Sequence, residues 1–510
     1  MGCRHSFLRG ERSVSSQPRG DVITVADDLE VGDADEVDYA VGFDAQACRE
    51  FTVGYVQKSQ KAKKEPLRAL RVSSLSGQVT LYLAKGEASK ATSASSASRL
   101  CPRADQQPSY CSRCPFCPGN ELKTLPEVLV FDEDGDDVPP GQSSAGEWLV
   151  RVFPNSSPTL ICPQDFYRSE QRDFGESVVA MDVSSEVENP TVMQVDARGV
   201  SEVVVESSVH NALLALQPPS HIQILLRALV SRAKVLSQQP WAKQLLFFKQ
   251  YGPLSGGSLV HPHMHIASLP VISPILLARL EYSVNFKKAH GSCPVCLAAV
   301  DPFVVKTLGG TRFPEAASNR LVHLTDHFVV SVPYASSGQY SMTIAPRRHC
   351  ADFAEISPEE IRDLAFLLAL LSQAIFHGLD DPSYNLFIRS APCIPQVRLG
   401  GREVLREELC EALHWVIEFR PRFPAEGGFF EAASGVRVVT GLPEEHAAEL
   451  RSWVLARLEA GVTPVPRMGR RTSIGSGGRR ASKVSSAFGD DALRASARCK
   501  AGGNSWAEPR

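Results

Sequence analysis

A long apolar run, a strong net charge and abundant aromatic residues are all missing from this chain. Its formal net charge is −3 and only 7% of its residues are aromatic, so it lacks the basic and stacking surfaces that nucleic-acid binding uses. No segment reaches the roughly 18 apolar residues of a membrane span. The longest candidate, 361–376, has Arg362 and Asp363 near its start and is typical of a buried or amphipathic helix. We expect neither a nucleic-acid partner nor an integral membrane span.

An apolar signal-peptide core is also missing, although the chain has 13 cysteines. Cysteines in that setting indicate a reducing, cytoplasmic location rather than a disulfide framework. The start of the chain nevertheless fits the pattern for N-myristoylation at Gly2, with Cys3 as a second acylation site. A chance match to so short a pattern is the alternative.

The most informative segment is 256–265, in which a Gly-Gly-Ser turn precedes His261, His263 and His265. Residues two apart in an extended segment point the same way, so we predict that the three imidazoles line one face beside a phosphate-sized backbone pocket. An imidazole can attack phosphorus and carry a nucleotidyl group, while its neighbours donate hydrogen bonds or hold a metal ion. A single histidine would more simply satisfy hydrogen bonds in the core. Three in alternation favour phosphoryl chemistry.

Two Cys-Pro-x-Cys knuckles, at 114–117 and 293–296, each have histidines downstream. Their spacing is typical of zinc ligands. One such pair could also be a redox centre, but its repetition in the same form favours metal binding.

Hydrophobic patterns in the two halves of the chain follow the same order, which predicts tandem copies of one unit. In the first half we expect strands over 148–153, 203–206, 245–249 and 259–266, with a helix over 221–236. In the second half we expect strands over 328–333, 340–344, 384–388 and 415–419, with a helix over 358–376. The predicted fold class is α+β, with two tandem units that are each an antiparallel sheet with covering helices.

The predicted domains are an acidic leader over 1–65, a first unit over 66–290, a second unit over 291–455 and a basic tail over 456–510. Composition predicts that both ends are disordered. The tail segments 470–473 and 479–482 have the pattern of basophilic-kinase sites, so a kinase is one expected partner. A solvated tail without function is the alternative.

Nine motifs occur in order: CPFCPGNE at 114–121, VFPN at 152–155, VVVESSVH at 203–210, FKQYG at 248–252, the triad, CPVC at 293–296, HFVVSVPY at 327–334, IAPRRH at 344–349 and HWVIE at 414–418. In this series the chain resembles the galactose-1-phosphate uridylyltransferase family of the histidine-triad superfamily, and in particular its ADP-glucose phosphorylase-like branch. The resemblance covers roughly residues 66–455. It implies two histidine-triad-like units, two zinc ions per chain and a homodimer.

The resemblance also assigns roles to single residues. His263 matches the nucleophile of a ping-pong reaction, and His265 is the second catalytic residue. One structural zinc ion is expected at Cys114, Cys117, His210 and His261, and a second, characteristic of the phosphorylase-like branch, at Cys293, Cys296, His327 and His414. The substrate-binding positions that it implies are Asn155, Gln250, Gly256, Gly257, Ser258 and Glu431.

Departures from the family pattern concern the acceptor. The family usually has Gln at the third triad position, whereas His265 is typical of hydrolytic histidine-triad proteins and can shuttle a proton. Gln250 replaces an Asn, and the segment 84–90 offers lysines where the family grips hexose phosphate with Arg. The expected function is nucleotidyl transfer from UDP-glucose or ADP-glucose to hexose 1-phosphate or phosphate. The alternatives are a nucleotide-sugar hydrolase and an inactive sugar-nucleotide sensor, although the intact His263 argues against a sensor.

Overall fold

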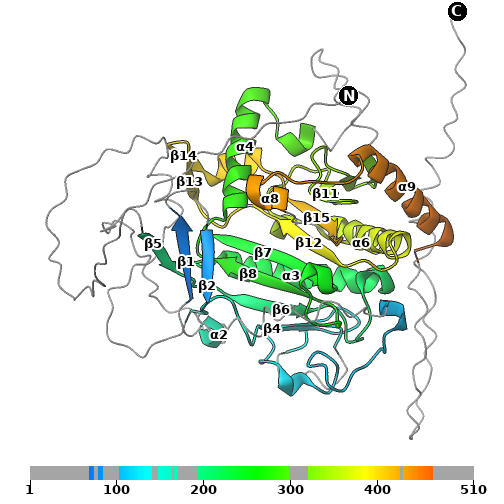
Figure 1. Ribbon diagram of the computed structural model, residues 1–510. Coiled ribbons are helices and arrows are strands. Elements are labelled where there is room, and N and C mark those ends of the chain that lie inside the picture. The colour runs from blue at the N-terminus through cyan, green and yellow to red at the C-terminus, as the bar shows by residue number, and fades with distance from the viewer. Residues whose placement is uncertain are drawn as a thin grey trace, which may run out of the picture. The chain divides into compact units, whose positions relative to one another are not determined.

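The computed structural model describes residues 68–73, 79–83, 103–139, 148–163, 166–169, 192–297, 320–424 and 429–462 (Figure 1). The strands are β1 Arg68–Ser73, β2 Val79–Leu83, β3 Leu129–Phe131, β4 Val150–Pro154, β5 Val192–Asp196, β6 Ser201–Val205, β7 Gln244–Tyr251, β8 His263–Leu269, β9 Leu321–Leu324, β10 Phe328–Ser331, β11 Met342–Pro346, β12 Tyr384–Arg389, β13 Gln396–Leu399, β14 Arg402–Leu405 and β15 Val416–Pro421. The α-helices are α2 Phe166–Ser169, α3 Pro219–Ser237, α4 Pro274–His290, α6 Pro358–Gly378, α7 Arg406–Ala412, α8 Phe429–Ser434 and α9 Pro443–Ala460.

Four of the sequence predictions lie outside the described residues. They are the acidic leader over 1–65 with its acylation positions, the lysine-bearing segment 84–90, the basic tail beyond residue 462 and its kinase patterns. The first residues assigned to that tail, 456–460, instead belong to helix α9.

Ten strands form one sheet in the order β3-β4-β6-β8-β7-β12-β15-β11-β10-β9. Read from each outer edge inward, the strands of both halves follow the same chain order, so the sheet has an internal pseudo-twofold relation between β7 and β12. These two strands pair antiparallel, with Phe248 opposite Phe387. The prediction of a separate sheet for each unit therefore differs from the structure. Pairing β7 with β12 satisfies backbone groups that would otherwise form two exposed edges.

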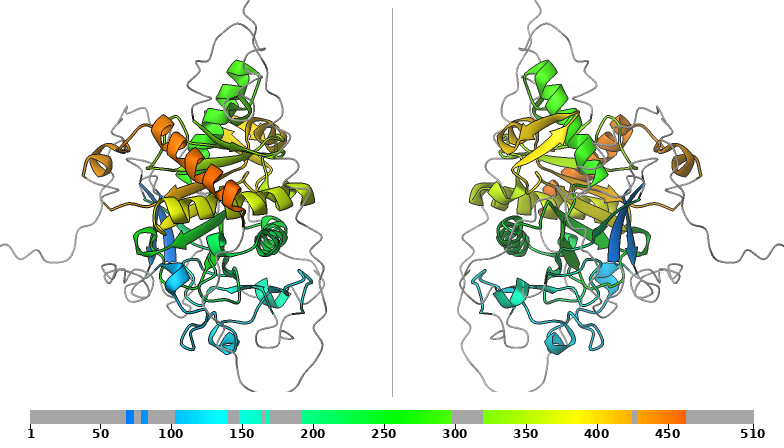
Figure 2. Two further views of the ribbon diagram at one scale, coloured as in Figure 1. Left: turned by 90° about the vertical axis from the view of Figure 1, so that its right-hand side faces the viewer. Right: turned by 90° about the vertical axis from the view of Figure 1, so that its left-hand side faces the viewer.

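The helices α3 and α6 pack against each other on one face of this sheet, and α9 packs on α6 (Figures 1 and 2). Each begins with a proline at its first helical position, where the missing amide hydrogen costs nothing. Helix α6 is long and apolar enough to cross a membrane by composition alone, but 72% of its most apolar window is buried within the protein. The expectation of a buried helix over 361–376 is confirmed.

The helices α3 and α6 cover one face of the sheet and form the core with it, so a site can lie only on the other face. Val204, Met264 and Ile417 point into this core. Because side chains alternate along a strand, His263 and His265 point to the opposite face. Helix α4 lies over the second half of that opposite face, where its Leu276 and Leu280 pack against the segment around α7. The first half of the face carries the triad.

Strand β8 begins four residues later than predicted. The alternation predicts a strand from 259, but the structure places His261 before the strand and starts pairing at His263. Pro262 lies between them and has no amide hydrogen to donate to a sheet ladder. His261 is therefore free to turn away, and the prediction that three imidazoles share one face holds only for His263 and His265.

The amino-terminal cap of α6 gives a stability prediction. The hydroxyl of Ser357 accepts a hydrogen bond from the Glu360 amide at 3.2 Å, and the Glu360 carboxylate accepts one from the Ser357 amide at 2.8 Å. We expect Ser357→Ala to lower the free energy of unfolding by about 1 kcal/mol, the usual loss for such a cap. Urea unfolding measures this change, and no shift of the midpoint relative to wild type would contradict it.

Candidate active site and metal centres

Cys114, Cys117, His210 and His261, here called the first cluster, bring four ligand atoms within 4.8 Å of one another. All four residues are buried. The His261 Nδ1 lies 3.7 Å from the Cys114 sulfur and 3.6 Å from the Cys117 sulfur, and the His210 Nδ1 lies 3.4 Å from the Cys117 sulfur. Two thiols and two imidazoles converging on one point match a closed, tetrahedral structural zinc site.

The second cluster consists of Cys293, Cys296, His349 and His414, with ligand atoms that again lie within 4.8 Å of one another. The His414 Nδ1 lies 3.7 Å from the Cys293 sulfur, and the His349 Nδ1 lies 3.2 Å from the Cys296 sulfur. The cysteines follow α4 and His414 precedes β15. A metal ion here would therefore fasten the end of α4 to the start of a central strand.

His327, the fourth ligand predicted for this set, does not belong to it. His327 lies in the turn between β9 and β10, where its backbone amide donates to Asp363 at 3.0 Å. This turn is one strand further from β15 than the end of β11, which carries His349. The pseudo-twofold relation gives the reason, because His349 follows the third strand of its half as His210 follows the third strand of the first half.

Each cluster holds its histidines in the orientation that a metal ligand needs. The second ring nitrogen of His261 donates to the Ser207 carbonyl at 2.7 Å, and that of His414 donates to the Pro346 carbonyl at 2.8 Å. His349 likewise donates to the Cys410 carbonyl at 2.9 Å. A carbonyl can only accept, so these bonds place the proton on Nε2 and leave Nδ1 to face the sulfurs. The donor sets therefore fit zinc.

The pKa values of the cluster cysteines also favour metal binding. Hydrogen bonding from Cys117 is the largest influence on the pKa of Cys114 and lowers it, with further lowering by the two histidines. Cys296 lowers the pKa of Cys293 in the same way, again with help from the histidines of its cluster. The thiolate, which is the form that binds a metal ion, is thus favoured at one cysteine of each pair.

The backbone of His261 also determines which ring nitrogen of His263 carries the proton. The Nδ1 of His263 lies 2.8 Å from the backbone carbonyl oxygen of His261. Since that oxygen can only accept, Nδ1 carries the proton and the lone pair of a neutral imidazole lies on Nε2. An imidazole with a free Nε2 is a nucleophile.

Aromatic side chains enclose the two triad imidazoles. Phe116, from inside the first knuckle, meets the His263 ring edge-on with centroids 5.3 Å apart. Phe248 of β7 stacks on His265 at 5.0 Å and 18°. The two imidazoles themselves lie 5.1 Å apart. The metal knuckle therefore supplies a wall of the site as well as ligands.

A buried ion pair lies behind these imidazoles, on the other face of the sheet. Lys249 lies opposite Met264 in the β7 and β8 register, and its ammonium group donates to the carboxylate of Glu206. Both side chains are 1% exposed or less. Burial lowers the pKa of Lys249, while Glu206 opposes that shift.

Burial and positive charge keep both triad imidazoles neutral. Desolvation, followed by repulsion from His265, lowers the pKa of His263 to about 3. Desolvation and the charge of Lys249 lower the pKa of His265 to about 4. At neutral pH both rings are uncharged, which suits a nucleophile and a hydrogen-bonding neighbour.

The glycine turn before the triad requires its glycines. Gly256 has φ +84°, a conformation that side chains disfavour. A Cβ on Gly257 would lie 3.0 Å from the backbone oxygens of Gln250 and Gly252. The side-chain amide of Gln250 donates to the Ser255 carbonyl at 3.2 Å, so it fixes the turn. Ser258 is exposed next to these glycines. The backbone amides of this turn are a suitable place for phosphate oxygens.

The two remaining predicted substrate residues lie further from His263. Asn155 follows β4 on the same face as the triad, and its side-chain oxygen accepts from the Ser157 amide at 3.0 Å. Glu431 lies on α8, where it accepts from the Val438 amide at 3.0 Å. No contact places either side chain against the triad within the described segments, so their substrate roles stay predictions.

Sequence reasoning missed several residues that build this site. His349, Phe116, Phe248, Lys249 and Glu206 all lie inside motifs that carry the family resemblance. The signal for His349 was its place after the third strand of the second half. The charged pair gave no local signal, because its partners are 43 residues apart in sequence.

Comparison with known proteins gives relatives that extend over most of the described chain. The ADP-glucose phosphorylase of Arabidopsis thaliana is 27% identical over 341 residues, which are 67% of this chain and 82% of that protein. A galactose-1-phosphate uridylyltransferase of Thermotoga maritima is 28% identical over 228 residues, 44% of this chain and 64% of the relative. The family model described as "Domain of unknown function (DUF4931) N-terminal domain" matches residues 191–272.

Two solved structures align with this chain over most of their own length. The crystal structure of an ADP-glucose phosphorylase from Arabidopsis thaliana with bound ADP-glucose aligns with a TM-score of 0.51 at 25% identity, covering 68% of this chain and 92% of that one. A uridylyltransferase structure aligns with a TM-score of 0.51 at 22% identity, covering 76% and 99% of the two chains. This second similarity concerns the fold alone.

The two clusters lead to a prediction on metal content. We expect two zinc ions per chain, and Cys114→Ser should release only the ion of the first cluster, since the second cluster shares none of its ligands. Cys162→Ser is the matched control, because Cys162 is a free cysteine outside both clusters. Elemental analysis of purified protein measures both values. Fewer than one zinc ion per wild-type chain would contradict the prediction.

Proposed function

Because the chain belongs to the galactose-1-phosphate uridylyltransferase family of nucleotidyltransferases, we propose that it transfers a nucleoside monophosphate from UDP-glucose or ADP-glucose through a covalent intermediate on His263. The observation that carries this proposal is the hydrogen bond from His263 Nδ1 to the His261 carbonyl. This bond leaves the Nε2 lone pair of a neutral imidazole available for attack.

The proposed reaction has two displacement steps. In the first, Nε2 of His263 bonds to the α-phosphorus while the bond from that phosphorus to the bridging oxygen breaks, and sugar 1-phosphate leaves. In the second, an oxygen of hexose 1-phosphate or phosphate bonds to the same phosphorus, and the phosphorus–nitrogen bond breaks. His263 begins and ends neutral, so the buried site never holds a free imidazolium between turnovers.

The other residues of the site orient and stabilise this exchange. We assign the backbone amides of the 256–258 turn to phosphate oxygens and His265 to a hydrogen bond with the transferred group. Lys249 lies behind the site, where its ammonium group is paired with the carboxylate of Glu206. A zinc ion in the first cluster would be structural and would hold His261, whose carbonyl orients the nucleophile.

Transfer to water is the second candidate, and His265 is the observation that favours it. His265 stands where transferases of the family usually have glutamine, and its neutral ring could accept a proton from water. Transfer to a phosphorylated acceptor is the first choice, because the second metal cluster and the similarity across 82% of the ADP-glucose phosphorylase point to that branch.

Removing the proposed nucleophile tests the covalent step. We expect His263→Ala to lose turnover by about 10⁴-fold or more, together with all nucleotidyl label on the denatured protein. His290→Ala, which changes an exposed histidine at the end of α4, should keep both. The label is measured after incubation with radiolabelled UDP-glucose and ADP-glucose. Label that persists in His263→Ala would move the nucleophile elsewhere.

Replacing His265 distinguishes the two acceptors. If His265 only orients the phosphoryl group, His265→Gln restores the family residue and should preserve or raise transfer to hexose 1-phosphate or phosphate. If it activates water, hydrolysis of the intermediate should fall by about 10²-fold. The partition of labelled intermediate between water and added acceptor is the readout. Wild-type protein that releases nucleotide equally fast with and without saturating acceptor would overturn the transferase assignment.

A further inference from the structure

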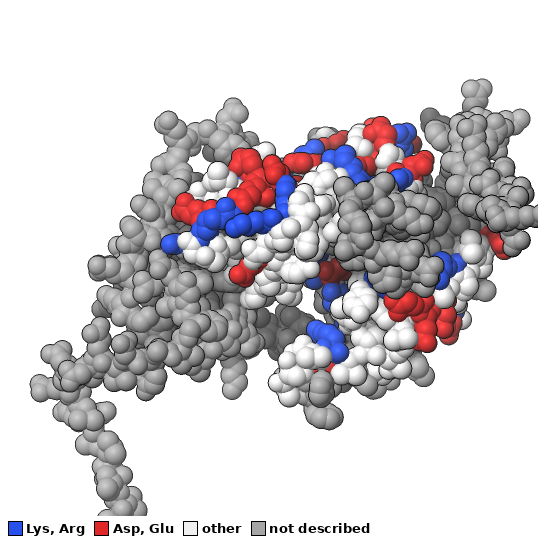
Figure 3. Space-filling view, turned by 90° about the horizontal axis from the view of Figure 1, so that it is seen from above, with Lys and Arg blue, Asp and Glu red and all other residues white. Residues whose placement is uncertain are grey.

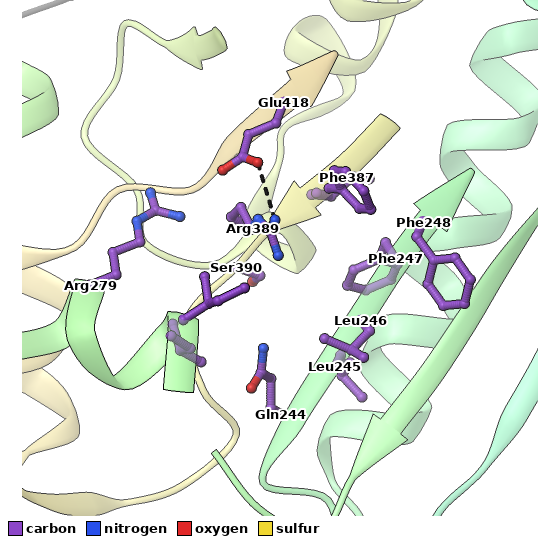
Figure 4. Close-up of a pocket in the computed structure, with 13 residues that line it drawn as sticks. Gln244, Leu245, Leu246, Phe247, Phe248, Arg279, Phe387, Arg389, Ser390 and Glu418 are labelled. Atoms are coloured by element: carbon purple, nitrogen blue, oxygen red, sulfur yellow. Dashed lines mark hydrogen bonds and ion pairs between the residues drawn. The ribbon is translucent and has the colours of Figure 1, made fainter. Parts of the chain in front are cut away.

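A cavity of about 190 Å³ lies beside the triad, between the open face of the sheet and the first turns of α4 (Figure 4). Phe248, which stacks on His265, also lines this cavity, so the cavity and the triad share a wall. The other lining residues on the open face come from three neighbouring strands and from α4, and they include Leu246, Phe387, Arg389, Glu418, Ile275 and Arg279.

The charged groups of this cavity are mostly positive. Arg279 and Arg389 line the cavity together with one carboxylate, that of Glu418. Arg389 donates to Glu418 at 3.1 Å, and Arg420, which does not line the cavity, donates to the same carboxylate oxygen at 2.5 Å. A guanidinium group keeps its charge at neutral pH. On the face seen in Figure 3, acidic and basic side chains are intermixed.

Two buried nitrogen atoms of the lining arginines have no acceptor. The Nη2 of Arg279 donates to the His414 carbonyl at 2.5 Å, but its Nη1 has no hydrogen-bond partner among the described residues. The Nε of Arg389 is also buried and without a partner there. Buried donors are normally satisfied. An acceptor-rich ligand between these side chains would satisfy both.

We propose that this cavity binds a phosphate group, either as inorganic phosphate or as the phosphate of a sugar. A phosphate monoester carries a charge of about −1.5 to −2 at neutral pH. This charge offsets the positive excess of the two lining guanidinium groups and the adjoining Arg420 over the one carboxylate of Glu418. Guanidinium forks match phosphate geometry bidentately. The guanidinium carbon of Arg389 lies 4.9 Å from the centroid of the Phe387 ring. The Phe248 ring gives the cavity an apolar wall, where the organic part of a sugar phosphate fits.

The place of the cavity suggests its role in the reaction. It lies on the β7 and β12 side of His265, whereas the first cluster and Phe116 close the opposite side of the triad. A phosphate bound here would lie on the side of His265 away from the first cluster, from which an acceptor oxygen could reach the group carried by His263. This role as an acceptor site rests on the proposed function, but the binding itself does not.

Calorimetric titration of the zinc-loaded, full-length protein with inorganic phosphate and with glucose 1-phosphate tests the proposal. Arg279→Met should weaken binding by about 10-fold or more, as expected when a charge-assisted hydrogen bond is removed. Ile275→Glu should have a similar effect, because it places a negative charge at the cavity and changes a side chain that is 65% exposed, so folding is preserved. Arg402→Gln, which removes an exposed arginine paired with Glu408, should bind as wild type does.

The two probes identify the source of the phosphate, and His263→Ala separates this proposal from the proposed function. A probe that binds in an Arg279-dependent and Ile275-dependent manner identifies the ligand. His263→Ala should keep that binding even if it loses all transfer. Wild-type protein that binds neither probe, or folded Arg279→Met and Ile275→Glu proteins that bind within about twofold of wild type, would overturn the proposal.

Discussion

The hydrogen bond between the His261 carbonyl and His263 Nδ1 is the interaction on which the site depends. His261 has three contacts at once: its Nδ1 faces two cysteine sulfurs, its Nε2 donates to Ser207, and its carbonyl accepts from His263. The first cluster thus fixes the backbone carbonyl that determines the tautomer of His263, the proposed nucleophile. A metal ion held by this cluster would therefore influence which ring nitrogen of His263 carries the lone pair.

Pseudo-symmetry explains how one framework supports two different halves. Both halves have the same strand order and a Cys2His2 cluster before a central strand. In the second half, Val416 stands where His263 would stand and Glu418 where His265 would stand, so this strand has no imidazole at the triad positions. A metal ion in its cluster would fasten the end of α4 to β15. The first half therefore carries the proposed nucleophile, and the second half contributes the part of the adjoining cavity's lining that comes from β12 and β15.

Local patterns predicted most of the fold, while contacts distant in sequence escaped them. Strand alternation, helix starts and the knuckles could be predicted from the sequence, because each depends on neighbouring residues. The pairing of β7 with β12 could not be predicted, since nothing in either strand indicates that the two edges pair. Spacing from the knuckle does not separate His327 from His349 as ligands. The position of His349 after the third strand of its half and the packing of β11 against β15 select it. The partnership of Lys249 with Glu206 required the folded sheet for the same reason.

The most direct test of this account is the tautomer of His263 in the zinc-loaded protein. A long-range ¹⁵N–¹H correlation spectrum of histidine-labelled protein reports which ring nitrogen carries the proton, and the signals that disappear in His263→Gln assign it. We predict a neutral ring that is protonated at Nδ1 and unprotonated at Nε2, and we expect Cys114→Ser, which removes a ligand of the first cluster, to abolish this single state. A wild-type ring protonated at Nε2 would contradict it.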